Sequence, residues 1–386
     1  MKKTLFFIIS VLLCSVLLMQ SAIGAFAVTS YDISQKFDET AEKLLSCPTP
    51  QVGSIGGEWM IIGLARSGKL TKEMSDGYYN NVVEYVKTKN SNTLHRRKST
   101  DNSRVILALS AIGVDARNVA GYDLVAPLFD YDYVKFQGIN GIIWALIAID
   151  SKNYSLPIDN IGTNSTTRER LIDGIIAAQL ADGGWTNSGE ISDPDMTSMA
   201  IQALAPYYWY DGSVKSSVDS ALYRLSELIT ANTGGKLSPD NCSQILVALT
   251  SLGIDPMNDK RFINSAGETL LDTMMTYSIT GGFMHQSGGE YDQMSTEQAY
   301  YAMTAYNRFC VGKSTLYDMT DTGTLSDFLF DFNYDGKEDI SDATWLQLYI
   351  AEYGDLDSYI KRIADQNQNG FVDIKDITSF QIHLSF

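Results

Sequence analysis

The chain has 386 residues, of which 46 are acidic and 29 are basic, so its formal net charge at pH 7 is −17. This acidity, without any block of Lys or Arg, argues against nucleic acid and anionic membranes as partners. The length fits one large domain followed by one small domain.

The first 27 residues have the pattern of a cleaved signal peptide. Two lysines precede an apolar run, and Ala25 and Ala27 occupy positions −3 and −1 of the expected cleavage site. The apolar run is shorter than the ~20 residues that span a bilayer. Cys14 lies within this run behind two leucines, where a lipoprotein anchor is not expected. We therefore expect a secreted, extracellular protein without membrane contact after cleavage, and loss of the two lysines takes the net charge to −19.

Three cysteines follow the signal peptide, Cys47, Cys242 and Cys310. They are too few, and odd in number, for a disulfide framework. A hydrophobic core must therefore hold the exported chain together.

One apolar pattern recurs six times in the first three hundred residues, and each copy is apolar nearly all round, which indicates a buried helix. More polar helices are expected between the copies, at 77–89, 168–179, 214–229 and 261–275. Repeats of paired helices mean a closed or stacked helical array. Six inner helices inside six outer ones predict an all-α protein with an (α/α)6 toroid over residues 28–310. The six apolar segments are 59–65, 103–113, 142–146, 197–204, 243–253 and 298–303.

A glycine-rich turn adds a family resemblance. Gln179, Gly183 and Trp185 fit the Gln-x3-Gly-x-Trp repeat, with weaker copies at 56–59 and 281–283. In this repeat the aromatic side chain packs on the next helix and the glutamine caps a helix end. Residues 45–310 thus resemble the squalene cyclase and prenyltransferase superfamily, whose members are terpenoid cyclase-like toroids.

Two short motifs raise the question of catalysis. Asp193-Pro-Asp195-Met196 stands where cyclases of this superfamily carry Asp-x-Asp-Asp, and the resemblance implies that Asp195 is the catalytic acid. Met196 replaces the neighbouring aspartate, which damages the network that tunes this acid. The alternative is that Asp193 or Asp195 only caps the start of an inner helix.

The second motif, Asp240-Asn-Cys242, resembles the zinc pair of protein prenyltransferases. Zinc there needs a third ligand, a histidine, and the matching position here is Ser295, although His285 lies nearby in sequence. Zinc in the toroid is therefore not expected, and Cys242 is expected to be buried and inert.

The inner helices of a toroid run parallel, so their N-termini line one mouth of the central cavity. Carboxylates among aromatic residues such as Trp144 and Tyr300 suit a sugar chain or a cation, and carboxylate pairs can cleave a glycosidic bond. Asp195 and Asp240 are the catalytic candidates. The helix dipole alone also favours carboxylates at these positions. The other residues expected at the rim are Glu58, Asp101, Asn140, Asp193, Asp292 and Glu297.

Residues 311–326 are short, polar and rich in Thr, Ser, Asp and Gly. This composition predicts a linker whose two flanking domains move independently.

Two segments that start 34 residues apart, at Asp331 and Asp365, place oxygen side chains at positions 1, 3, 5, 9 and 12 and glycine at position 6. Calcium needs six to eight oxygen ligands, and the glycine permits the sharp turn between them. Position 7 contributes a backbone carbonyl, so the sequence predicts two calcium ions. The expected ligands are Asp331, Asn333, Asp335, Lys337, Asp339 and Asp342 in the first loop, and Asp365, Asn367, Asn369, Phe371, Asp373 and Asp376 in the second.

A helix is expected after each loop, at 343–353 and 377–384, while no good helix precedes either loop. This duplicated loop-then-helix unit at 327–386 closely resembles the type I dockerin family. The resemblance implies a cohesin domain of a scaffolding protein as partner. Ser341 and Lys375 differ at matching positions, so one preferred orientation on the cohesin is expected. The implied cohesin-facing residues are Ile340, Ser341, Gln347, Ile374, Lys375 and Gln381.

Together these interpretations predict a secreted component of a cohesin–dockerin assembly of the cellulosome kind, whose toroid is a binding or structural module. One alternative is a glycan-active enzyme of polysaccharide degradation, because dockerin cargo usually acts on plant polysaccharides. A second is a terpenoid cyclase-like, prenyltransferase-like or small-ligand pocket of the cobalamin-carrier type. If the toroid is an enzyme, a polysaccharide hydrolase or lyase is favoured over a terpenoid cyclase.

Overall fold

The computed structural model describes residues 30–155, 164–230, 237–323, 330–333 and 337–385. The expected signal peptide, Asp335 (an expected calcium ligand) and the last residues of the expected linker lie outside this part of the chain. Within it helices dominate, and the strands β1 (Ser278–Ile279) and β2 (Gly282–Phe283) form one short antiparallel hairpin. The expectation of an all-α protein is therefore confirmed.

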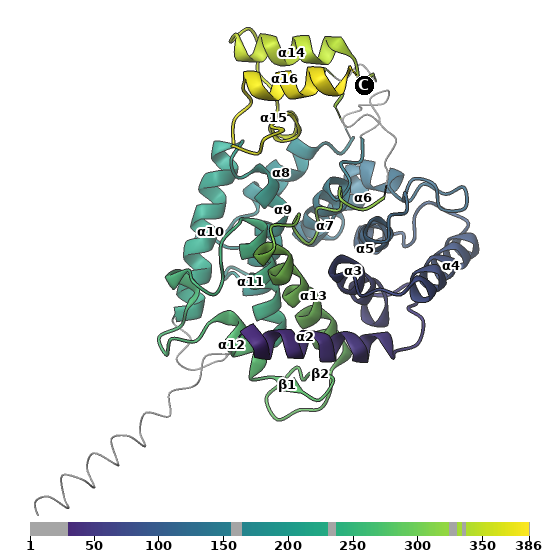
Figure 1. Cartoon of the computed structure of the whole chain (residues 1–386), viewed down its shortest axis with the longest axis vertical. Helices are drawn as coiled ribbons and strands as arrows, with labels where there is room; N and C mark the ends of the chain where they lie inside the picture. Colours follow the sequence, from purple (N-terminus) through teal and green to yellow (C-terminus); the bar gives the residue numbers. More distant parts are fainter. Residues whose placement is uncertain (1–29, 156–163, 231–236, 324–329, 334–336, 386) are drawn as a thin grey trace, which may run out of the picture.

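Six helices pack side by side in cyclic order, each against the next and the last against the first (Figure 1). We call them the ring helices. Each overlaps one of the six apolar segments, and neighbours cover it both within the ring and outside it, which is why it is apolar nearly all round. They are α3 (Trp59–Ser67), α5 (Ser99–Ala111), α7 (Gly138–Asp150), α9 (Pro194–Leu204), α11 (Pro239–Ser251) and α13 (Gln293–Cys310).

A second set of helices covers the outside of the ring. Their apolar residues form a single stripe; in α10, for example, Val214, Val218, Leu222 and Leu225 are buried three or four residues apart. These helices are α2 (Ser30–Leu45), α4 (Lys72–Lys89), α6 (Tyr131–Lys135), α8 (Arg168–Ala177), α10 (Gly212–Thr230) and α12 (Leu270–Met275), with the short turns η1 (Ser54–Glu58), η2 (Ala126–Phe129), η4 (Ala205–Tyr207) and η5 (Lys260–Phe262).

The prediction of an outer helix at 261–275 is wrong over the first half of that range. The Asn264 side chain accepts hydrogen bonds from the backbone N–H groups of Ala266 and Glu268, both at 2.9 Å, and Gly267 has φ +83°. These local bonds close a turn, so the helix begins only after the Thr269 cap.

The glycine-rich turn at 179–185 ties two outer helices together. Gln179 Nε2 donates to the carbonyls of Gly183 at 2.7 Å and Ser217 at 2.8 Å, so the glutamine joins the turn to α10 instead of capping a helix end. Gly183 has φ +90°, and a Cβ there would lie 2.9 Å from a carbonyl of α10. Trp185 is fully buried and donates to the Ile175 carbonyl at 2.7 Å.

Residues 313–322 bond to the C-terminal ends of the ring helices α3, α5, α7 and α13, and we call them the strap. Arg66 of α3 donates to the carbonyls of Leu316 at 3.0 Å and Thr315 at 2.9 Å. Arg66 and Arg308 both form ion pairs with Asp321. The strap therefore differs from the loose linker expected from its composition, because its polar groups are partners for buried arginines.

The described residues 330–333 and 337–385 form a small C-terminal unit that contains the helices α14 (Ile340–Ile350), α15 (Ser358–Ala364) and α16 (Ile374–His383). Its core contains Phe332, Leu346, Ile360, Ile377 and Phe380, each at most 1% exposed. Helices α14 and α16 pack on each other, and α15 lies between them and the ring helices (Figure 1).

Two expectations for this unit need correction. Helices α14 and α16 begin three residues earlier than expected, because Asp339 and Asp373 cap them. A helix does precede the second loop: α15 starts at its Asp357 cap and ends directly before Asp365. Its residues Tyr359 and Ile360 are buried, so tertiary contacts stabilise a helix that its short sequence did not indicate.

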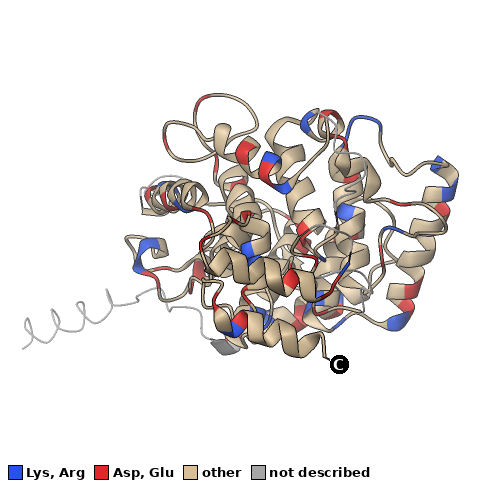
Figure 2. Ribbon diagram, turned by 90° about the horizontal axis from the view of Figure 1, so that it is seen from above, with Lys and Arg blue, Asp and Glu red and all other residues tan. Residues whose placement is uncertain are grey.

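Acidic and basic residues are interspersed along the helices (Figure 2). Among the described residues, none of the helices combines the length and the apolar character that crossing a bilayer requires.

Candidate functional site

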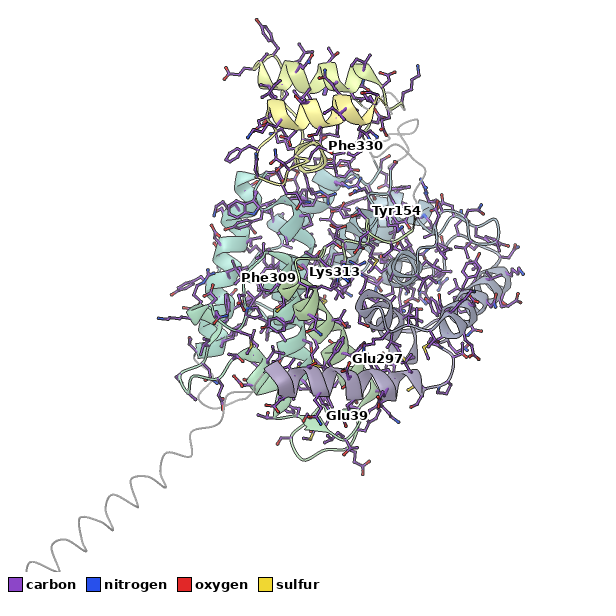
Figure 3. The ribbon with its side chains drawn as sticks, in the orientation of Figure 1. Glu39, Tyr154, Glu297, Phe309, Lys313 and Phe330 are labelled. Carbon is purple, nitrogen blue, oxygen red and sulfur yellow. The ribbon has the colours of Figure 1, made fainter. Side chains whose placement is uncertain are left out.

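Side chains near the N-termini of the ring helices join neighbouring helices to one another. Thr100 N of α5 donates to Gln137 Oε1 before α7 at 2.9 Å, and Gly56 N before α3 donates to Glu297 Oε1 of α13 at 2.9 Å. Glu297 lies at this end of α13 and Phe309 at the other (Figure 3). This end of the ring is thus a polar rim, as the parallel arrangement of inner helices predicts.

The two catalytic candidates lie in one polar cluster on this rim. Asp195 Oδ1 accepts a 2.7 Å hydrogen bond from Asn241 Nδ2, next in sequence to Asp240. Asp240 Oδ2 lies 2.9 Å from His285 Nδ1, which is also 3.3 Å from Ser295 Oγ. We call these five residues the rim cluster; it brings together three ring helices and the turn before α13.

Electrostatics set the two carboxyl groups of the rim cluster apart from ordinary surface aspartates. Burial raises the pKa of Asp195, against the lowering effect of its Asn241 hydrogen bond. Burial likewise raises the pKa of Asp240, whose Oδ1 atom is buried and has no hydrogen-bond partner among the described residues. His285 is half exposed and gives the cluster a side open to solvent. Raised carboxyl pKa values beside a histidine side chain are typical of acid–base sites.

Two other carboxylates expected at the rim, Asp193 and Asp292, cap the starts of ring helices. Asp193 accepts from Met196 N at 2.8 Å, and Asp292 accepts from Ser295 N at 2.7 Å. Asp193 is thus the cap of α9, which leaves Asp195 free to bond a side chain. Asp101 pairs with Arg104 at 3.1 Å, and Asn140 is half-buried in the first turn of α7.

Glu58 and Glu297 are both completely buried beside the short turn η1. Glu58 accepts from Gly53 N at 3.0 Å and pairs with Arg104 Nε at 3.2 Å, and burial raises its pKa to about 7. Burial also raises the pKa of Glu297 to about 7, and its Oε2 atom has no hydrogen-bond partner among the described residues. These two groups hold the backbone of the turn rather than face solvent.

Aromatic side chains meet inside the ring. The rings of Trp59 and Trp144 are 5.0 Å apart, and Tyr301 lies 5.9 Å from Trp59. Tyr317 of the strap packs edge-on against Trp144 at 5.8 Å and is 7% exposed. Trp144 is therefore in the interior, while Tyr300, also expected at the rim or wall, stacks behind the ring on Phe37 of α2.

Cys242 is fully buried, and burial raises the pKa of its thiol. In the described part of the chain, no three His, Cys, Asp or Glu side chains are grouped to hold a metal ion. Asp335 lies outside this part of the chain, and a calcium loop also depends on asparagine and backbone carbonyl oxygens.

The two expected calcium loops share one hydrogen-bond pattern. In the first, Asp342 Oδ2 accepts from Asp339 N at 2.9 Å, and its Oδ1 accepts from Asn333 N at 3.2 Å. In the second, Asp376 Oδ2 accepts from Asp373 N at 2.8 Å, and its Oδ1 accepts from Asn367 N at 3.2 Å. Ligand positions 3, 9 and 12 are thus drawn together in both loops.

The burial of carboxylates in these loops indicates whether the loops suit a cation. Asp342 and Asp376 are 0% exposed and Asp365 is 3% exposed, and none of the three pairs with a Lys, Arg or His side chain among the described residues. Burial raises the pKa of Asp342. Buried carboxylates without a cationic partner are costly, so an oxygen-rich loop that contains them fits a calcium ion.

The residues expected to face cohesin lie on the surface. Ile340 and Ile374, at matching positions of the two repeats, are 63% and 62% exposed. Lys375 and Gln347 are also exposed, while Ser341 and Gln381 are half-buried. Trp345, Leu348 and Ile382 add further exposed apolar surface on α14 and α16.

Arg104, Asn241 and Tyr210 were not among the site residues expected from the sequence. The sequence does mark Arg104, because it is the one basic residue of the apolar segment 103–113. Asn241 had only its position beside Asp240. Nothing in the sequence singles out Tyr210, whose hydroxyl donates to Asp365 Oδ2 at 2.9 Å across 155 residues.

No family model matches this chain, and no curated protein or solved structure does either.

Proposed function

We propose that this protein is a secreted component of a cohesin–dockerin assembly, in which residues 327–386 are a type I dockerin and residues 28–310 are an (α/α)6 toroid carried as cargo. The observation that supports this most is the internal symmetry of the C-terminal unit. Two loop–helix repeats with matching hydrogen bonds end in helices that expose an isoleucine at the same position. An exposed apolar residue repeated in this way fits a docking surface.

In this proposal each loop holds one calcium ion. Asp331, Asn333, Asp339 and Asp342, with Asp335 and the Lys337 carbonyl, hold the first, and the six equivalent residues of 365–376 hold the second. Calcium when bound neutralises the buried carboxylates and fixes each loop to its helix. Asp339 and Asp373 also cap α14 and α16, so the same residues orient the exposed isoleucines.

The direct test is titration calorimetry of the full secreted chain against a panel of type I cohesin domains, with calcium and with a chelator. We expect binding only with calcium. The double substitution Ile340→Asp with Ile374→Asp should weaken binding by 2 kcal/mol or more, about 30-fold. The two single substitutions should differ from each other, because Ser341 and Lys375 differ.

Tyr353→Asp is the matched control, since Tyr353 is 83% exposed on the same unit but outside the expected cohesin-facing set. Its affinity should equal that of the wild type. Binding that survives both isoleucine substitutions, or that is indifferent to calcium, would remove the docking proposal.

For the toroid we propose a binding or structural module, supported by the aromatic side chains that meet inside the ring. A second candidate, a glycan-active enzyme, is supported by the raised pKa values of Asp195 and Asp240 in a cluster that is partly open to solvent. Product analysis on a panel of plant polysaccharides tests it. Turnover that is lost in Asp240→Asn and kept in Asp101→Asn would establish the glycan-active enzyme. If no polysaccharide of the panel is turned over, the binding or structural module stands as the proposal for the toroid.

A further inference from the structure

The C-terminal unit is joined to the ring helices by a buried charged network. Asp150, at the end of α7, accepts from Arg168 Nε at 2.7 Å and from the Tyr207 hydroxyl at 2.6 Å. Arg362 of α15 reaches the same carboxylate at 3.7 Å and donates to Asn153 Oδ1 at 2.8 Å. One buried carboxylate therefore serves both parts of the chain.

An aromatic ring completes this contact. Tyr359 of α15 is 9% exposed, and its ring lies 3.9 Å from the Arg168 guanidinium and 5.3 Å from that of Arg362. Cation–π pairs that are partly removed from water, as these are, stabilise the packed arrangement. The docked position of α15 is thus specified by groups from both sides, unlike the independent movement expected for the two domains.

Next to this network the second calcium loop contacts the rest of the protein. Tyr210, which follows η4, donates its hydroxyl to Asp365 Oδ2 at 2.9 Å. The same carboxylate accepts from Gly370 N at 2.7 Å and, through Oδ1, from Asn369 N at 3.1 Å. A Cβ built on Gly370 would lie 3.8 Å from Trp209 Cβ, so this turn of the loop rests on the segment that carries Tyr210.

These bonds leave Asp365 able to bind a cation. A carboxylate has about four lone-pair sites, and three donors still leave one on Oδ1. Asp365 occupies position 1 of the loop, a ligand position in calcium loops. Hydrogen bonds from outside the ligand set orient a ligand and commonly change metal affinity by 10- to 100-fold.

We propose that Tyr210 is a positioning residue of the second calcium site, so that docking of the C-terminal unit tightens calcium binding at that site. The proposal rests on the calcium-binding function proposed above. The second loop has particular need of such support, because Asn369 at position 5 lacks the charge of an aspartate. Binding linkage is reciprocal, so calcium at this loop also strengthens the docked arrangement by the same factor.

The experiment is calcium titration calorimetry on the full secreted chain and its Tyr210→Phe variant, each first freed of calcium. We expect two calcium-binding steps in the wild type. In Tyr210→Phe one step should weaken by about tenfold, with the other unchanged. Tyr208→Phe is the matched control, since Tyr208 donates to Asp219 at 2.7 Å and not to the loop; both of its steps should match the wild type.

A second variant, Arg362→Glu, tests the same link without altering Tyr210 or the loop. It places a carboxylate beside Asp150 and should release the C-terminal unit, so the same calcium-binding step should weaken. The double variant Tyr210→Phe with Arg362→Glu should lose no more calcium affinity than Arg362→Glu alone. Melting in chelator confirms that each variant is folded.

Two unchanged steps in Tyr210→Phe, or equal weakening of both, would overturn the role of Tyr210 while leaving calcium binding itself in place. A wild-type chain that binds no calcium would instead remove the proposed function, and the inference with it.

Discussion

At the scale of single residues, the structure sorts carboxylates that look alike in the sequence. Asp193 and Asp195 are two residues apart, yet Asp193 caps α9 while Asp195 bonds the Asn241 side chain. Glu58 and Glu297, both expected at the rim, lie at that end of the ring and are fully buried there. Burial favours the neutral form of a carboxyl group, and this has a measurable consequence.

The free energy of unfolding should fall as pH rises from about 5 to 7.5. Burial raises the folded-state pKa values of Glu58 and Glu297 to about 7, above the ordinary value near 4.5. The folded state then binds more protons than the unfolded state, so stability is full below pH ~4.5 and is lost through pH 7. In Glu297→Gln the fall should be smaller by about 1 to 3 kcal/mol, measured by urea unfolding at each pH.

Glu42→Gln is the control for this prediction, because Glu42 is exposed on α2. Its pH profile should follow the wild type. Parallel profiles for Glu297→Gln and the wild type would show that this carboxyl group does not titrate in the expected window.

At the scale of elements, the ring helices could be predicted because each is apolar on all sides, a pattern that surface helices do not have. The strap could not, since its polar composition is that of a linker. Its role depends on Arg66 and Arg308, which are 4% and 6% exposed and need acceptors. Those acceptors are backbone carbonyls and Asp321, which composition does not reveal.

A chain that ends at residue 312 should be less stable than one that ends at residue 323. The shorter chain loses the acceptors of two buried guanidinium groups and the Tyr317 ring that covers Trp144. Breaking buried ion pairs costs about 3 to 5 kcal/mol, so a difference of at least ~3 kcal/mol is expected in urea unfolding. Asp321→Asn in the longer chain should cost less, because the carbonyl acceptors are kept. Equal stability of the two chains would mean that the strap contributes nothing to the free energy of unfolding.

At the scale of the whole molecule, the C-terminal unit and the ring helices form one polar interface around Asp150. Its members come from α7, α8, η4 and α15, which lie more than 200 residues apart at the extremes. Only the folded chain brings them together, so the linker composition gave no indication of a fixed arrangement.

The docked arrangement should be visible in solution scattering. A compact chain of this length has a radius of gyration of about 21 Å. Arg362→Glu places two carboxylates side by side in a buried position and should increase that radius by several ångströms. Lys375→Glu makes the same charge change at an exposed site and should leave the radius as it is. An unchanged radius in Arg362→Glu would show that this network does not hold the two parts together.

The sequence by itself determined the helical class, the places of the six ring helices and the spacing of oxygen side chains in the two expected calcium loops. These features are local or periodic: apolar residues that recur around a helix, and side chains at fixed offsets within twelve residues. The tertiary structure decided the burial of Glu58 and Glu297, the pairing of Asp195 with Asn241, the position of the strap against Arg66 and Arg308, and the contact of Tyr210 with Asp365. Each of these joins residues distant in the chain, and the free energy of a buried charge depends on which partners the fold brings to it.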